Sequence, residues 1–313
     1  MLIKYMNAEH LDFLDNSLFR ITQPQYLNDP PGEARFAPFY NNFSDADLEY
    51  ARKKYRTSWL NNGTSPNDSF LIDNFLRPTG MRYTVEQFPL LKSFADYETT
   101  DEFDRSKAIQ LIEIINNLLL DRMNHSIGIF SLSDSLTNHD MWIKYGQHGK
   151  GIALEFDKQH PFFQQNPTTK VIYSNKKRAS ITYYEGCIRI NGIRLKSKYE
   201  SQLDVQNHLL SEIDLKDLMT RLFFTKNSRW ESENEHRIIF NLIQHDQRNG
   251  EVFLKKIPFD SFKTLTFGWD TSVKTIKEIA QKVKKNPELA HLKIQKVCYD
   301  QLENYDHLEV IDI

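Results

Sequence analysis

Residues 127–156 read IGIFSLSDSLTNHDMWIKYGQHGKGIALEF, and this stretch decides the fold class. Its two ends, 127–132 and 151–156, have the short apolar composition of strands. Between them lies a short segment that holds Trp142 and Tyr145. Elsewhere, strand-like runs are interrupted by helical segments without regular strand–helix alternation. This pattern predicts an α+β fold with a mixed, largely antiparallel sheet and helical insertions.

The chain shows no internal sign of a domain boundary. It has no linker rich in Gly and Ser, no repeat and no low-complexity tract. We therefore expect a single α+β domain over residues 1–313, with a helical insertion at about 34–124 and a second helical segment at about 199–224. Within the insertion, apolar residues at helical spacing predict a helix over residues 103–123. A chain of this length can bury a sizeable core without disulfides or metals.

Composition and charge exclude several classes of protein. Hydrophobic residues make up 40% and charged residues 26% of the chain, which excludes a mostly disordered or membrane-embedded protein. The 40 Lys and Arg against 42 Asp and Glu give a net charge of −2, so broad wrapping of nucleic acid is not expected. The N-terminus has no secretion signal, and the two cysteines fit a reducing compartment. We expect a cytoplasmic protein without a membrane partner.

The strongest polar cluster is KNSRWESENEHR, at residues 226–237. On a strand, Glu233, Glu235 and Arg237 would project to the same face. Two carboxylates with an Arg beside them can stabilise a developing cation or orient a nucleophile. The alternative is an exposed charge ladder that is paired across strands. The other candidate ligand contacts in this cluster are Lys226 and Trp230.

A second cluster combines a hydroxyl group, aromatic rings and a glycine-containing turn. Ser131 lies in the strand-like run, and Trp142 and Tyr145 are three residues apart on one helical face. Glycines then form a flexible turn into the next strand, with neither Rossmann nor Walker A spacing. The rings could clamp a flat ligand such as nicotinamide or a base. The alternative is that both rings anchor a helix in the core.

A third cluster lies near the N-terminus. Arg20 is a candidate for binding a pyrophosphate or a carboxylate, and Asn28 sits in a turn that it could simply cap. The ten His residues lack ligand-type pairing and there is no CxxC, so structural zinc is not expected. A magnesium site stays open because carboxylates suffice for that metal. Its candidate ligands are Asp29, Glu33, Glu233 and Glu235.

Together, the three clusters resemble the bacterial domain of unknown function numbered 2971. Its members show a strand with a Pro and an Asn-Asp-Pro turn, matched here at 19–30. A Phe-Ser strand, a Trp-x-x-Tyr step and a Gly-led strand ending in Phe follow, matched at 130–156. The most specific motif is Lys-x-x-x-Trp-x-x-Glu-x-Glu-x-Arg, matched at 226–237. The sequence departs from the pattern in the insertion at about 34–124 and in Pro31, where an aromatic residue is usual.

More distantly, the order of these motifs is similar to that of NAD-dependent ADP-ribosyltransferases, in which a small split sheet holds NAD. The resemblance implies that NAD is the substrate and that no metal is needed. By this resemblance, Glu235 stabilises the oxocarbenium-like ribose as nicotinamide leaves, Glu233 orients the acceptor, and Arg237 completes the catalytic group. The NAD contacts that it implies are Arg20, Asn28, Ser131, Trp142, Tyr145, Lys226 and Trp230.

Three classes of function follow from these residues. The first is an NAD-consuming transferase, such as a toxin or phage-defence effector, acting on a protein or nucleic-acid acceptor. The second is a metal-dependent nuclease or phosphoesterase built on the four carboxylates. The third is a non-catalytic module that senses a nucleotide or binds a partner. Each of these three classes is compatible with a homo-oligomer.

Overall fold

The computed structural model describes residues 1–27, 34–58, 66–77, 100–195, 207–208, 211–299 and 308–312. Two compact units are formed, each from segments that are far apart in the sequence. The first unit contains Met1–Tyr26, Met123–Tyr173 and Asn227–Ile313, and the second contains Leu27–Arg122 and Ser174–Lys226. The second unit therefore takes up nearly all of the two segments that the sequence marks as insertions. The expectation of a single domain stays a prediction.

An eight-stranded sheet forms the centre of the first unit, in the order β17-β16-β15-β5-β1-β4-β12-β6. Its neighbouring strands are antiparallel except for β15 and β16. This arrangement confirms the α+β class with a mixed, largely antiparallel sheet. The strands are β1 (Leu2–Met6), β4 (Ile127–Ser133), β5 (Ile152–Phe156), β6 (Thr169–Lys170), β12 (Glu235–Asn241), β15 (Phe262–Phe267), β16 (Lys293–Tyr299) and β17 (Leu308–Asp312).

The sheet forks between β1 and β4. Strand β1 pairs with β5 along its whole length, but its pairing with β4 consists of the single pair Ile3↔Ser133 in the described residues. Further along, Ile129 of β4 pairs instead with Thr22, through two N–H···O bonds of 2.8 Å. Thr22 directly follows β2 (Leu18–Ile21). The central sheet is therefore split, with β1 and the end of β2 lying along different parts of one edge of β4.

A second, three-stranded sheet in the order β13-β14-β2 completes the strands around this core. Aromatic rings fill the space, and Phe19 of β2 packs edge-on against Phe130, Phe156 and Phe262 from the central sheet. Such edge-to-face pairs add to the stabilisation that burial provides. Further elements of this unit include β7 (Ile172–Tyr173), β13 (Gln247–Asn249), β14 (Val252–Lys256), α1 (Phe13–Asn16), α5 (His139–Lys144), α6 (Pro161–Gln165), α9 (Val273–Lys285) and the short helix η6 (Ser228–Glu233).

The second unit has its own four-stranded sheet, in the order β10-β9-β8-β3. The sequence predicts a helical insertion at 34–124, yet β3 lies within it and pairs in parallel with β8. The helix predicted at 103–123 is confirmed as α4, which ends where β4 of the first unit begins. The elements are β3 (Ala37–Tyr40), β8 (Ser180–Tyr184), β9 (Cys187–Ile190), β10 (Ile193–Arg194), β11 (Thr225–Lys226), α2 (Asp45–Ser58), α3 (Asp68–Leu71), η2 (Ile72–Leu76), α4 (Thr100–Ser126) and α8 (Leu215–Phe223).

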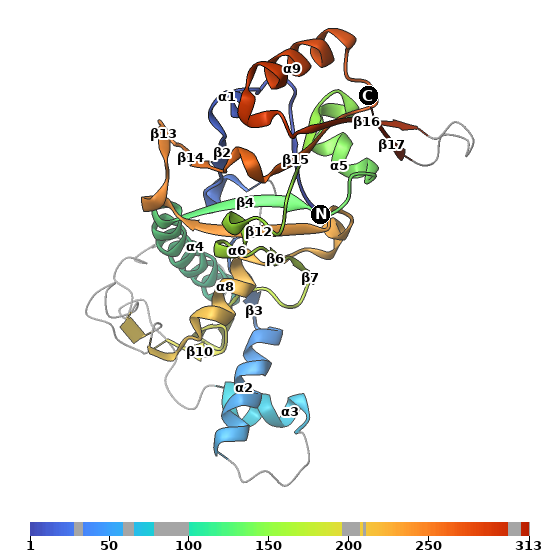
Figure 1. Ribbon diagram of the computed structural model, residues 1–313. Helices are drawn as coiled ribbons and strands as arrows, with labels where there is room; N and C mark the ends of the chain where they lie inside the picture. The colour runs from blue at the N-terminus through green and yellow to red at the C-terminus, as the bar shows by residue number, and fades with distance from the viewer. Residues whose placement is uncertain are drawn as a thin grey trace. The chain divides into compact units, whose positions relative to one another are not determined.

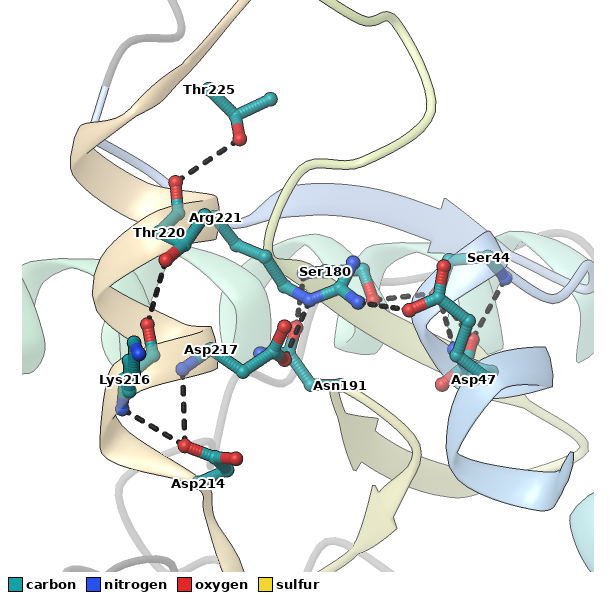
Figure 2. Close-up of polar contacts among 11 residues, drawn as sticks. Ser44, Asp47, Ser180, Asn191, Asp214, Lys216, Asp217, Thr220, Arg221 and Thr225 are labelled. Carbon is teal, nitrogen blue, oxygen red and sulfur yellow. Dashed lines mark hydrogen bonds and ion pairs between the residues drawn. The ribbon is translucent and has the colours of Figure 1, made fainter. Parts of the chain in front are cut away.

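Side-chain caps set where two helices of the second unit begin (Figure 2). The Asp214 carboxylate accepts from the backbone N–H groups of Lys216 and Asp217, at 3.0 and 3.1 Å. Helix α8 therefore starts at Leu215, and the helical segment predicted at about 199–224 is interrupted at residues 213 and 214. Ser44 and Asp47 cap α2 reciprocally, because each accepts the backbone N–H of the other.

Candidate functional site

The pairing of β4 with β12 brings the central motif residues together in the first unit, where the two strands lie side by side (Figure 1). Glu235 is the cross-strand partner of Ser133, and Arg237 is the partner of Ser131. Directly paired residues in antiparallel strands carry their side chains on the same face. Ser131, Glu235 and Arg237 therefore share one face of the sheet, as the alternating pattern predicts for the two charged residues.

Glu235 and Arg237 form a buried ion pair with two contacts. Arg237 Nε donates to Glu235 Oε1 at 2.7 Å, and Nη2 donates to Oε2 at 2.9 Å. Glu235 is only 7% exposed and Arg237 only 1%. The backbone N–H of Glu235 donates to the Tyr173 hydroxyl at 2.8 Å, which also fixes the start of the strand. The carboxylate thus has a defined position and orientation, which electrostatic catalysis requires.

Glu233 does not lie on the strand, so the expectation that it continues the alternation of Glu235 and Arg237 is wrong. It is the last residue of η6, and Asn234, between it and the strand, has a left-handed backbone with φ of 45°. Asn tolerates this conformation better than most residues. The left-handed backbone at Asn234 changes the direction of the chain, and the Glu233 carbonyl accepts a hydrogen bond from the Ser133 hydroxyl at 2.9 Å. Glu233 nevertheless stays buried, at 2% exposure.

The Glu233 side chain belongs to a separate cluster built from α5 and η6. The Tyr145 hydroxyl donates to Glu233 Oε1 at 3.2 Å, and Lys144 Nζ lies 3.6 Å from the same oxygen. Lys144 also lies 4.5 Å from the centre of the Trp230 ring, and the guanidinium of Arg229 lies 5.0 Å from it. The structure therefore brings Tyr145, Trp230 and Glu233 together around a cationic and aromatic surface, which suits an anionic ligand that carries a flat ring.

Trp142 is a core residue. It is 0% exposed, and its indole N–H donates to the Leu136 carbonyl at 2.7 Å. Tyr5 packs edge-on against the ring, with 5.0 Å between centroids. The geometry thus favours the alternative in which Trp142 anchors a helix, and we do not retain this ring as a contact for NAD.

The remaining predicted contacts belong to other segments of the chain. Arg20 is exposed on β2, with its guanidinium 5.8 Å from the centre of the Tyr26 ring. Lys226 is buried in β11, the last residue of the second unit. Asn28 lies outside the described residues, as do Asp29 and Glu33 of the magnesium hypothesis.

Lys4 is a candidate that the sequence analysis missed. Its ammonium group donates to the Ser131 carbonyl at 2.9 Å and lies 4.9 Å from the centre of the Phe130 ring. Burial lowers the pKa of Lys4 to about 8, although the charge of Glu235 raises it and the charge of Arg20 lowers it further. The charges of two predicted site residues, Glu235 and Arg20, therefore act on Lys4. The available signal was a lysine inside the apolar run LIKYM at 2–6.

The glycine-containing turn before β5 is tightly packed, in contrast to the flexible turn that the sequence suggests. Gln147, His148 and Gly149 have positive φ angles of 52°, 55° and 78°. The Gly149 N–H donates to the Gly146 carbonyl at 3.0 Å, which closes the turn. A Cβ atom added at Gly149 would lie 2.1 Å from the Trp269 ring. The turn is therefore fixed against that indole.

Within the described ranges, no three His, Cys, Asp or Glu side chains gather in a way that could hold a metal ion. The structure describes two of the four carboxylates that the sequence offers as magnesium ligands, and both contact cationic side chains. Glu235 is paired with Arg237, and Glu233 contacts Tyr145 and Lys144.

Comparison with known protein families gives a match to part of the chain. Residues 141–238 match a family described as "Protein of unknown function (DUF2971)". No curated protein and no solved structure matches the chain. The matched segment contains Tyr145, Trp230, Glu233, Glu235 and Arg237, so it includes both carboxylate clusters of the first unit. None of the helices in the described part of the chain has the length and apolar character needed to cross a membrane.

Proposed function

We propose that this protein is an NAD-dependent enzyme similar to the ADP-ribosyltransferases. It transfers ADP-ribose from NAD to a macromolecular acceptor, which is a protein or a nucleic acid. It acts in the cytoplasm as a toxin or as an effector of phage defence. NAD serves as a substrate, and no metal takes part in the reaction.

The fork between β1 and β4 is the observation that carries this proposal. The resemblance to ADP-ribosyltransferases implies a split sheet that holds NAD, and here β4 keeps one residue pair with β1 before it pairs with Thr22. Ser133 is the β4 residue of that one pair, and its partner on the other side is Glu235. The proposed catalytic carboxylate therefore lies directly across β4 from the point where the sheet splits.

The proposed reaction breaks the bond between the nicotinamide nitrogen and C1′ of the ribose. Nicotinamide leaves with the bonding electron pair, and positive charge develops on the ribose. The Glu235 carboxylate, held in place by Arg237, stabilises that charge. The acceptor then forms the new bond to C1′ and passes its proton to Glu233. When water replaces the acceptor, it forms the bond to C1′ and releases its proton to the solvent, so that NAD is hydrolysed without the help of Glu233.

Release of nicotinamide by the purified protein tests this function. The protein is incubated with NAD and a bacterial lysate as acceptor, with and without EDTA. Release should persist with the chelator and fall at least about 100-fold in Glu235→Gln, because that variant lacks the negative charge. The matched control is Glu278→Gln, which alters an exposed glutamate of α9 and should leave release unchanged.

Three results would redirect the assignment. NAD that raises the melting temperature without any release of nicotinamide would indicate the sensing module instead. No release together with no thermal shift would refute NAD as the substrate. Activity on nucleic acid or phosphoesters that appears only with magnesium would favour the metal-dependent hypothesis.

A further inference from the structure

The fork in the central sheet contains a lysine that the proposed reaction does not use. If the pairing of β1 with β4 continued beyond Ile3↔Ser133, Tyr5 would be the partner of Ser131. Instead, the ammonium group of Lys4 occupies this position and donates to the Ser131 carbonyl. Lys4 remains partly exposed, so a ligand in the fork can reach it.

The other side of the fork brings a second cation to the same strand. Thr22 pairs with Ile129, two residues from Ser131 on β4, and Arg20 precedes Thr22 by two residues. Two residues of a strand span about 6.6 Å. Among the residues that the structure describes, neither Lys4 nor Arg20 forms an ion pair with a carboxylate. Within the described residues, the fork therefore holds two cations without an ion-paired carboxylate, although the charge of Glu235 acts on Lys4.

We propose that Lys4 and Arg20 form an anion site in the fork, which binds the diphosphate group of a dinucleotide. The identity of this ligand rests on the proposed function, in which NAD is the substrate. The guanidinium can bind phosphate oxygens through two donors, and the ammonium acts as a compact point charge. Bound diphosphate would also offset the repulsion between the two cations.

The protonation of Lys4 makes this site sensitive to pH. The charged groups that act on Lys4 are Glu235 on β12 and Arg20 on β2, whereas its neighbours on β4 and β5, Phe130 and Leu154, are uncharged. Burial lowers the pKa of Lys4 to about 8. Above that pH the unliganded protein loses the positive charge, so binding of the diphosphate weakens and becomes coupled to uptake of a proton.

Calorimetric titration of the full chain tests the site with two probes, inorganic pyrophosphate and ADP-ribose. At neutral pH we expect Lys4→Met and Arg20→Met to weaken the binding of both probes by about tenfold or more. Lys4→Arg should stay within about threefold of the wild type because it keeps the charge. The control is Lys277→Met, which removes an exposed lysine from α9. Its affinity should not change.

The pH dependence provides a second test that does not need Lys4→Met to fold. ADP-ribose keeps the same diphosphate charge through the neutral and alkaline range. Its affinity for the wild type should fall above pH 8, whereas its affinity for Lys4→Arg should stay constant, because Arg remains protonated. Identical pH profiles in the two proteins would overturn the proposal.

Failure of this site and failure of the proposed function give different results. Wild-type-like affinity of Lys4→Met for both probes, with NAD turnover intact, would overturn the anion site and leave the transferase function standing. Loss of pyrophosphate binding in Lys4→Met, in a protein that neither binds ADP-ribose nor consumes NAD, would support the anion site and refute the function. If the wild type binds neither probe, the anion site is wrong, and the assay of nicotinamide release decides the transferase function separately.

Discussion

Arg237 binds both carboxylate oxygens of Glu235, its neighbour two positions away on the same face of β12. The pair is almost fully buried, so each charge depends on the other for the interactions that water would otherwise supply. The same contact that orients the proposed catalytic carboxylate therefore also stabilises the central sheet. Substitutions at either position should therefore change both activity and stability.

Arg237→Met should lower the free energy of unfolding by about 3–5 kcal/mol, because it leaves the Glu235 carboxylate buried without its cation. Urea denaturation followed by circular dichroism measures this loss. The double variant Glu235→Gln/Arg237→Met should recover part of it, since no buried charge remains unpaired. Arg248→Met, on exposed β13, should stay within about 0.5 kcal/mol of the wild type. A double variant less stable than Arg237→Met would contradict this explanation.

Glu233→Gln and Glu235→Gln should affect different steps. Under the proposed mechanism, Glu233→Gln retains hydrolysis of NAD but loses at least about tenfold in transfer to the acceptor, because it cannot take the acceptor's proton. Glu235→Gln should lose both activities. Nicotinamide release and labelling of acceptors from adenine-labelled NAD measure the two steps. Equal losses of hydrolysis and transfer in Glu233→Gln would argue against a separate role for that residue.

Gly149→Ala should destabilise the protein more than Gly250→Ala. Both glycines have positive φ, 78° and 59°, so both substitutions strain the backbone. A Cβ at Gly149 meets the Trp269 ring at 2.1 Å, whereas nothing lies within 4 Å of a Cβ at Gly250. Gly149→Ala should lower the free energy of unfolding by about 1–3 kcal/mol more than Gly250→Ala does, which is the usual range for overpacking. Thermal unfolding can measure this difference. Equal losses would show that the turn can move away from the indole.

Lys4→Met should change how stability depends on pH. The pKa of Lys4 is about 8 in the folded protein, whereas the ordinary value of 10.5 applies in the unfolded chain, so between these values the unfolded chain binds more protons. Lys4 therefore makes the free energy of unfolding rise with pH in this window, and its contribution is constant below it. The difference in unfolding free energy between wild type and Lys4→Met should rise by up to roughly 3 kcal/mol across the window.

Urea denaturation at several pH values from about 7 to 10.5 measures this difference. Lys277→Met supplies the control, because its lysine is exposed on α9 and the stability difference from wild type should stay flat. A flat difference for Lys4→Met as well would mean that Lys4 titrates as an ordinary surface lysine.

The elements with strong periodicity could be predicted from the sequence, and those that depend on distant partners could not. Apolar residues at helical spacing predicted α4, and the short apolar runs predicted β4 and β5. Strand β3 was missed because its partner, β8, lies about 140 residues further along the chain. The start of α8 is set by the Asp214 cap, which the continuous helical pattern concealed.

At the candidate site, the sequence predicted several of the residues that come together. It did not predict the backbone conformation and the side-chain directions by which they do so. The pattern correctly placed Glu235 and Arg237 on one face. It could not show that the left-handed backbone of Asn234 separates Glu233 from the strand. It also could not decide whether Trp142 faces a ligand or the core, since both arrangements use the same spacing. Lys4 escaped notice because only the fork between β1 and β4 gives it a special position.

The interleaved order of the segments has a consequence for synthesis of the chain on the ribosome. Strand β1 is made first, but both of its partners lie between Ile127 and Phe156. At about 5–20 residues per second, the roughly 120 residues between Met6 and Ile127 take on the order of ten seconds to translate. During that time Leu2 and Ile3, fully buried in the finished sheet, emerge without the strands that cover them. In the nascent chain, β1 is therefore a natural client for chaperones that shield apolar segments until β4 and β5 have been made.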